Sequence, residues 1–74
     1  MPPKIRELKA KLRKAGFTSR PGKGSHRVFT HPDLPGARLV LAGSDGDDAQ
    51  HYQIADVQEL LEQLHTQQRQ EGRK

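Results

Sequence analysis

The stretch GKGSHRVFTHP, residues 22–32, contains His26, whose side chain can act as an acid or as a base in catalysis. An unperturbed imidazole has a pKa of about 6.5, so it takes up or releases a proton near neutral pH. Such a group can remove the proton from a ribose 2′-hydroxyl, after which RNA cleaves itself by internal attack on phosphorus. Lys23 and Arg27 flank His26 in sequence and are suited to face the charge that develops on the phosphate.

Two glycines and a serine precede this histidine. Gly22 and Gly24 would let the backbone approach a phosphate closely, and Ser25 offers a hydroxyl that could orient the group to be cleaved. The same residues also suit an ordinary strand entry, in which the glycines form a turn and the histidine has no chemical task. The spacing alone leaves both interpretations open.

The other histidines and the single tyrosine are better explained without chemistry. Period-two alternation places His31 on the opposite strand face from His26, which also argues against a metal site shared by the two. We expect Tyr52 to pack on a helix and His51 to be solvated. His65 follows the last apolar residue of the chain, and we assign it no role.

Charge is divided unevenly along the chain. Residues 1–27 hold nine bases and one acid, a net charge of +8, whereas residues 28–74 hold four bases and eight acids, a net charge of −4. This asymmetry indicates a polyanionic partner for the first third of the chain. The aspartates of GSDGDD, residues 43–48, lack the ligand spacing of a calcium loop, so a flexible, solvated turn is expected there.

Length and composition limit the kind of site. A chain of 74 residues with 31% hydrophobic and 4% aromatic residues has a thin core, so we expect an open active face that suits an extended substrate. The absence of cysteine excludes a disulfide framework and a thiolate metal site. No apolar run is as long as a membrane span. We therefore expect a cytoplasmic protein with no metal and no small-molecule cofactor.

Apolar periodicity predicts the elements that position these residues. Residues 3–15 have helical spacing and a basic outer surface, and Gly16 should end this helix near Ala15. Strand candidates follow at residues 17–20, 25–31 and 37–42, joined by turns that are rich in glycine and proline. Residues 53–64 form a second amphipathic helix with an acidic outer surface.

These elements predict an α+β fold in the order α-β-β-β-α, with a three-stranded antiparallel sheet and two helices on one face of it. Phe29 marks the core face of the central strand, which leaves His26 on the open face. We expect one domain over residues 1–65. Residues 66–74 are polar and are expected to form a disordered tail.

The segments KIRELKAKLRKAGF and KGSHRVFTHP, followed by a short strand and an amphipathic helix, resemble the HicA family of toxins, also described as YcfA-like, from type II toxin–antitoxin systems. The resemblance covers residues 4–64. It implies a fold like that of a double-stranded RNA-binding domain and the activity of a messenger-RNA interferase. It also implies that His26 is catalytic, that Gly24 and Ser25 shape the motif around it, and that a HicB-type antitoxin covers the RNA-binding face.

Our leading hypothesis is a metal-independent endoribonuclease of HicA type that cleaves messenger RNA. A non-catalytic RNA-binding module is the alternative, and an interaction protein that docks a partner on its acidic helix is a third possibility. In the leading hypothesis His26 transfers the proton, and RNA is bound by Lys11, Lys14, Arg20, Lys23, Gly24, Ser25 and Arg27.

Overall fold

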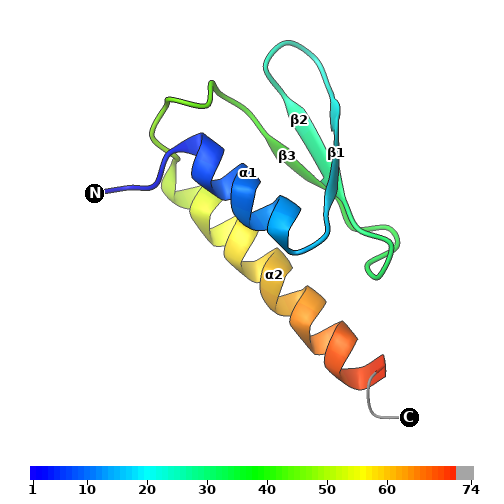
Figure 1. The fold of residues 1–74 in the computed structure, drawn as a ribbon. Helices are drawn as coiled ribbons and strands as arrows, with labels where there is room; N and C mark the ends of the chain where they lie inside the picture. Colours follow the sequence, from blue (N-terminus) through cyan, green and yellow to red (C-terminus); the bar gives the residue numbers. More distant parts are fainter. Residues whose placement is uncertain (72–74) are drawn as a thin grey trace.

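The computed structural model describes residues 1–71 and has two layers. The three strands form one antiparallel sheet in the order β1-β2-β3, and both helices lie on one face of it (Figure 1). The predicted α+β fold and its three-stranded meander are confirmed. No helix within residues 1–71 is both long enough and apolar enough to cross a membrane. The elements are α1 (Ile5–Lys14), β1 (Thr18–Pro21), β2 (Arg27–Thr30), β3 (Leu39–Leu41) and α2 (His51–Glu71).

The apolar core lies between the sheet and the helix layer. Phe29 of β2 is completely buried, which confirms the predicted core face of the central strand. Val40 of β3 is exposed, because neighbouring strand residues point to opposite faces and its neighbours face the helices. The sheet therefore keeps one face open to solvent. The largest fully buried side chains are Ile5, Leu8, Leu12, Phe29, Leu41, Val57 and Leu64.

Helix α1 ends where the sequence predicts. Gly16 has φ of 100°, a left-handed conformation that favours glycine. The N–H of Gly16 donates to the carbonyl of Arg13 at 3.0 Å, and the N–H of Phe17 donates to the carbonyl of Leu12 at 3.0 Å. These two bonds form a Schellman motif, which turns the chain from α1 into β1 and buries Phe17 against the core.

His31 locks this helix end to the sheet. Its Nε2–H donates to the carbonyl of Ala15 at 3.1 Å, and its Nδ1 accepts the N–H of Asp33 at 3.0 Å. Because a carbonyl only accepts and an amide N–H only donates, these partners fix the neutral Nε2–H tautomer. The ring also packs edge-on against Phe17, with 4.9 Å between centroids. His31 thus lies on the core face, opposite to His26 as predicted, and has a structural role.

Two of the three strands are shorter than predicted, and β1 spans Thr18–Pro21 rather than residues 17–20. β2 begins at Arg27 rather than at residue 25, and β3 spans Leu39–Leu41 rather than residues 37–42. Turn hydrogen bonds account for the difference, because the N–H of Ala37 donates to the carbonyl of Leu34 at 3.1 Å instead of joining the ladder. Backbone groups that close a turn cannot also pair with a neighbouring strand.

Helix α2 is longer than predicted. It continues to Glu71, so the expectation of a disordered tail over residues 66–74 is wrong for residues 66–71, and residues 72–74 lie outside the described residues. No glycine or proline interrupts residues 51–71. The Gln, Glu and Arg residues beyond Leu64 favour a helix even where they do not pack against the core. Gln68 Nε2 also donates to Asp33 Oδ2 at 3.3 Å, which holds this last part of α2 to the β2-β3 connection.

Candidate functional site

His26 lies in the turn that joins β1 to β2, one residue before β2 begins. The prediction that it belongs to the strand is therefore wrong. Its N–H donates to the carbonyl of Lys23 at 3.0 Å, and its carbonyl accepts the N–H of Gly22 at 2.9 Å. Gly24 lies between these residues with φ of 59°, a conformation that suits glycine. The backbone of His26 is thus fixed on both sides although it is not in the ladder.

The side chain of His26 is on the open face of the sheet. A Cβ added to Gly22 would lie 3.3 Å from Cβ of His26 and 3.6 Å from Cγ2 of Val28, so all three residues share one face. The helices cover the other face, and His26 is exposed. The expectation of an exposed histidine on the open face is confirmed. A side chain at position 22 would crowd His26, so the close approach of the two backbone segments favours glycine there.

The basic residues near His26 divide between the two faces. Arg20 is the register partner of Val28 and is exposed, so it shares the open face with His26. Lys23 is exposed within the turn. Arg27 is the register partner of the buried Leu41, which places its side chain on the helix side of the sheet. Of the two cations that flank His26 in sequence, only Lys23 is therefore free to reach the open face.

Lys11 and Lys14 lie in the helix layer. Together with Ala15 they line a shallow hollow of about 290 Å³, whose other side is formed by Leu61 and His65 of α2. These lysines are near the C-terminal end of α1, whereas Figure 1 shows the β1-β2 turn at the opposite end of β1. The predicted RNA-binding residues thus form two separate basic surfaces, one at the hairpin and one between the helices.

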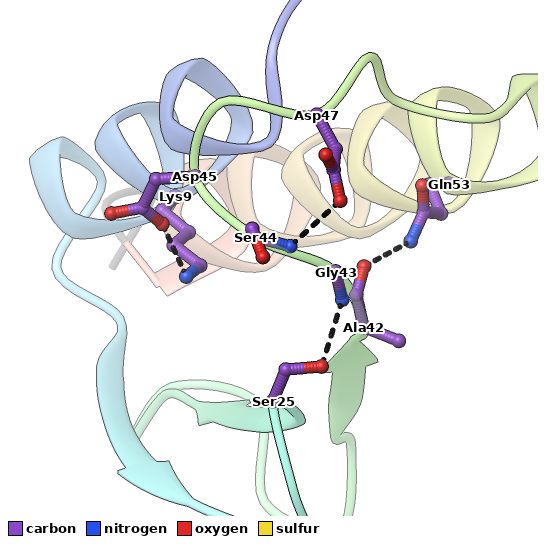
Figure 2. A network of polar contacts seen from close by, with 8 residues as sticks. All are labelled: Lys9, Ser25, Ala42, Gly43, Ser44, Asp45, Asp47 and Gln53. Atoms are coloured by element: carbon purple, nitrogen blue, oxygen red, sulfur yellow. Dashed lines mark hydrogen bonds and ion pairs between the residues drawn. The ribbon is translucent and has the colours of Figure 1, made fainter.

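Ser25 connects the hairpin to the loop between β3 and α2. The N–H of Gly43 donates to Ser25 Oγ at 3.4 Å, as Figure 2 shows. The residue before Gly43 is held in turn, because Gln53 Nε2 of α2 donates to the carbonyl of Ala42 at 3.0 Å. Ser25 therefore joins the turn that carries His26 to a fixed part of the molecule. Its hydroxyl proton remains available for a second partner.

The same loop is tied to α1 by its acidic residues. Lys9 Nζ donates to Asp45 Oδ1 at 2.6 Å, and the Lys9 side chain is only 10% exposed (Figure 2). This hydrogen bond and the charge of Lys9 lower the pKa of Asp45, with smaller contributions from Arg13 and Arg27. Lys4 pairs with Asp48 in the same way.

The loop is therefore less free than the sequence suggests. Its aspartates are exposed as expected, but its backbone accepts from the first residues of α1: the N–H of Ile5 donates to the carbonyl of Asp47 at 2.9 Å, and the N–H of Arg6 donates to that of Asp45 at 3.2 Å. The two ion pairs also engage Lys4 and Lys9, two of the nine bases in residues 1–27. The positive surface that remains for a polyanion is correspondingly smaller.

Tyr52 differs from its expected position. It is 62% exposed, so the prediction that it packs on a helix is wrong, whereas His51 is exposed as expected. The exposure of Tyr52 could have been predicted from helical spacing. Residues 52, 56 and 59 lie on one side of α2, and the latter two are acidic. The buried side of the helix is instead the one that contains Gln53 and Val57.

Comparison with known proteins adds one match. A family model described as "HicA toxin of bacterial toxin-antitoxin" matches residues 5–66 of the 74-residue chain. None of the curated proteins and none of the solved structures is a significant match. The matched residues include α1, the complete sheet with its hairpin, and most of α2. The candidate site therefore lies entirely within the matched region.

Proposed function

Because the chain belongs to the HicA toxin family of bacterial toxin–antitoxin systems, we propose that it is an endoribonuclease that cleaves messenger RNA without a metal ion. The placement of His26 carries this proposal. Both ring nitrogens of His31 are bound to backbone groups, whereas the ring of His26 has no hydrogen bond to any of residues 1–71. An exposed imidazole without a partner, on the open face of a sheet, is available for proton transfer to and from a bound substrate.

The reaction needs one proton-transfer residue and the substrate's own nucleophile. The neutral imidazole of His26 removes the proton of a ribose 2′-hydroxyl, and the 2′-oxygen attacks the neighbouring phosphorus. The bond from phosphorus to the 5′-oxygen breaks, that oxygen takes a proton from solvent water, and the imidazolium of His26 returns its proton to solvent. The products are a 2′,3′-cyclic phosphate and a 5′-hydroxyl end. Lys23 and Arg20, both exposed at the hairpin, would hold the phosphates that flank the cleaved bond.

The surroundings of His26 suit a long substrate. His26 is exposed on the open face, so a ribose-phosphate backbone that lies along this face can reach the imidazole. The hydrogen bond between Gly43 and Ser25 keeps the turn in place while the substrate binds. Pre-organisation of this kind raises the rate, because the reacting groups need not be ordered during the reaction.

We further propose that the partner of this toxin is a HicB-type antitoxin that covers the open face. A protein bound over Arg20, Lys23 and His26 would block RNA and imidazole together. An acidic or apolar contact surface on that partner would match the exposed bases and the exposed Val40 of this face.

The test is cleavage of a long single-stranded RNA in EDTA by the wild-type protein and by His26→Ala, with analysis of the product ends. We expect the wild type to leave 2′,3′-cyclic phosphates. We expect the variant to be slower by at least about 10²-fold, the usual range for loss of a general base, with nearly unchanged RNA affinity. His65→Ala, which removes an exposed histidine of α2, is the matched control and should cleave normally.

Two results would contradict the proposal. Equal cleavage by wild type and His26→Ala would assign the activity to another residue or to a contaminant. RNA binding without cleavage by any variant would instead favour the non-catalytic RNA-binding module.

A further inference from the structure

Tyr52 is an unusual surface residue in this protein. Only three large hydrophobic side chains in the described residues are exposed, namely Met1, Val40 and Tyr52. Met1 precedes the first element and Val40 lies on the open sheet face. Tyr52 is in the first turn of α2, where an exposed aromatic ring contributes nothing to the core. A large ring that is left in water is typical of a binding contact.

The position of Tyr52 is fixed by its neighbour. Gln53 is 4% exposed, and both ends of its amide are engaged: Oε1 accepts the N–H of Gln50 at 2.8 Å, and Nε2 donates to the carbonyl of Ala42 at 3.0 Å. The first turn of α2 is thereby fastened to the end of β3. Tyr52 is attached to this fastened turn, so little backbone freedom is lost when a ligand binds its ring.

A hollow of about 330 Å³ adjoins the ring of Tyr52. Its lining also includes Gly43, Asp47 and Asp48 of the loop between β3 and α2. Gly43 is also the residue that donates to Ser25 Oγ in the turn between β1 and β2 (Figure 2). One hydrogen bond therefore connects the lining of the hollow to the turn that carries His26.

From this arrangement we propose that the hollow beside Tyr52 binds one unpaired base of the RNA substrate, stacked on the tyrosine ring. The inference rests on the proposed nuclease function and extends it to a second contact, away from the cleaved bond. Single-stranded RNA is bound in this way when a base is turned out and stacked on an aromatic side chain.

The charges of the site decide which part of RNA enters. Asp48 is paired with Lys4, whereas Asp47 has no ion pair within residues 1–71 and disfavours a phosphate in the hollow. We therefore expect the base to enter the hollow while the phosphates are bound by Lys23 and Arg20. Carboxylate oxygens accept hydrogen bonds from the amino groups on base edges.

The experiment uses the fact that Tyr52 is the only tyrosine and that the chain has no tryptophan. Intrinsic fluorescence of the full-length wild-type protein therefore reports on this one ring. A short single-stranded oligoribonucleotide with 2′-O-methyl groups at every position cannot undergo internal attack, so it serves as an uncleaved probe. We expect saturable quenching of the tyrosine emission, with the same midpoint as the binding curve from anisotropy of a labelled copy. Free N-acetyltyrosinamide titrated with the same RNA corrects for absorption by the bases.

Two variants complete the design. Tyr52→Ala should bind the probe about ten-fold more weakly, whereas Tyr52→Phe, which keeps a ring for stacking, should bind nearly as the wild type. Both should keep the wild-type melting temperature, because the side chain is largely exposed.

The outcomes separate this proposal from the nuclease proposal. Full RNA binding with unchanged tyrosine emission, or equal affinity of Tyr52→Ala and wild type, would overturn the stacking site and leave the nuclease function intact. In that case quenching by an added antitoxin would assign the ring to a protein contact. No RNA binding by any variant would overturn both proposals.

Discussion

At the scale of single residues, the two histidines on either side of β2 have opposite surroundings. His31 is buried and bound through both ring nitrogens, whereas the ring of His26 is exposed and makes no hydrogen bond within residues 1–71. The two residues directly flank β2, at positions that differ by five, so the alternation of the strand between them places them on opposite faces. One histidine therefore stabilises the fold, and the other remains available for chemistry.

Gly16 and Gly24 give a matched test of the contact between α1 and His31. Both have positive φ, so Gly24→Ala should lower the free energy of unfolding by about 1 kcal/mol through backbone strain alone, since its Cβ would meet nothing within 4 Å. In Gly16→Ala the added Cβ would also lie 2.9 Å from His31 Nε2 and disturb its bond to Ala15. We expect a loss of about 2 kcal/mol or more there, measured by urea unfolding. Equal losses in the two variants would show that His31 moves aside freely.

At the scale of elements, the loop between β3 and α2 is the part that the sequence describes least well. The sequence shows three aspartates and two glycines, which predict a solvated turn. The structure adds partners that are 36 and 44 residues away, Lys9 for Asp45 and Lys4 for Asp48. Such pairs depend on how the elements pack, and local patterns carry no information about them.

The pair between Lys9 and Asp45 makes stability depend on pH in acid. The pKa of Asp45 is lowered in the folded state, first by the hydrogen bond from Lys9 and then by its charge. The ionised carboxylate therefore stabilises the fold at pH values above its ordinary pKa of 3.8, and this contribution is lost as the pH falls through the lowered value. Asp45→Asn should be less stable than wild type at neutral pH, and the difference should vanish in strong acid.

Urea unfolding over a pH series measures this difference. Asp56→Asn, at an exposed position of α2, is the control for a general loss of negative charge. A difference between wild type and Asp45→Asn that stays constant from neutral pH to pH values well below 3.8 would contradict the assignment.

Helices and strands are more predictable from the sequence than their ends. The apolar spacing from Ile5 to Leu12 and the glycine at 16 are sufficient for α1, and the alternation around Phe29 is sufficient for the core face. The end of α2 differs from the prediction because the lack of apolar residues after Leu64 does not by itself exclude a helix. Helix propensity can extend a helix beyond its core contacts when an anchored part precedes it.

For the candidate site, the chain position of His26, its open face and the opposite face of Arg27 were predictable from the alternation around Phe29, but the separation of Lys11 and Lys14 from the hairpin was not. Arg27 follows His26 directly, and in an extended chain neighbouring residues must point to opposite faces. Although Arg27 is adjacent to His26 in sequence, the two side chains therefore lie on opposite faces of the sheet. The hollow beside Tyr52 was also not predictable, since its walls come from α1, the loop and α2.

At the scale of the whole molecule, the protein consists of a sheet layer and a helix layer, and each layer has a basic surface. Its Cα extents are 42 × 27 × 18 Å, and the shortest dimension leaves no interior for an enclosed site. Arg20 and Lys23 are exposed at the hairpin, whereas Lys11 and Lys14 lie between the helices. The salt dependence of RNA binding can tell which surface RNA uses.

We expect the hairpin surface to dominate, since it carries His26. Replacing both Arg20 and Lys23 by Gln should reduce the slope of log K against log salt by about 1.4, or about 0.7 for each phosphate of single-stranded RNA that is no longer neutralised. The double variant with Gln at Lys11 and Lys14 is the matched control and should change the slope less. Anisotropy of an uncleavable labelled RNA at several salt concentrations gives both slopes. The opposite ranking would place the RNA on the helix layer.

The division of the core between the two ends of the chain has a consequence for synthesis of the toxin. Ile5, Leu8 and Leu12 belong to the same core cluster as Val57 and Leu64 of α2, which is translated after all the strands. A nascent chain that lacks α2 also lacks Val57, Leu60 and Leu64 of this core, and Gln53 is not yet there to hold the end of β3. The hairpin with His26 is thus made before α2, but it gains this support only when α2 has also been made.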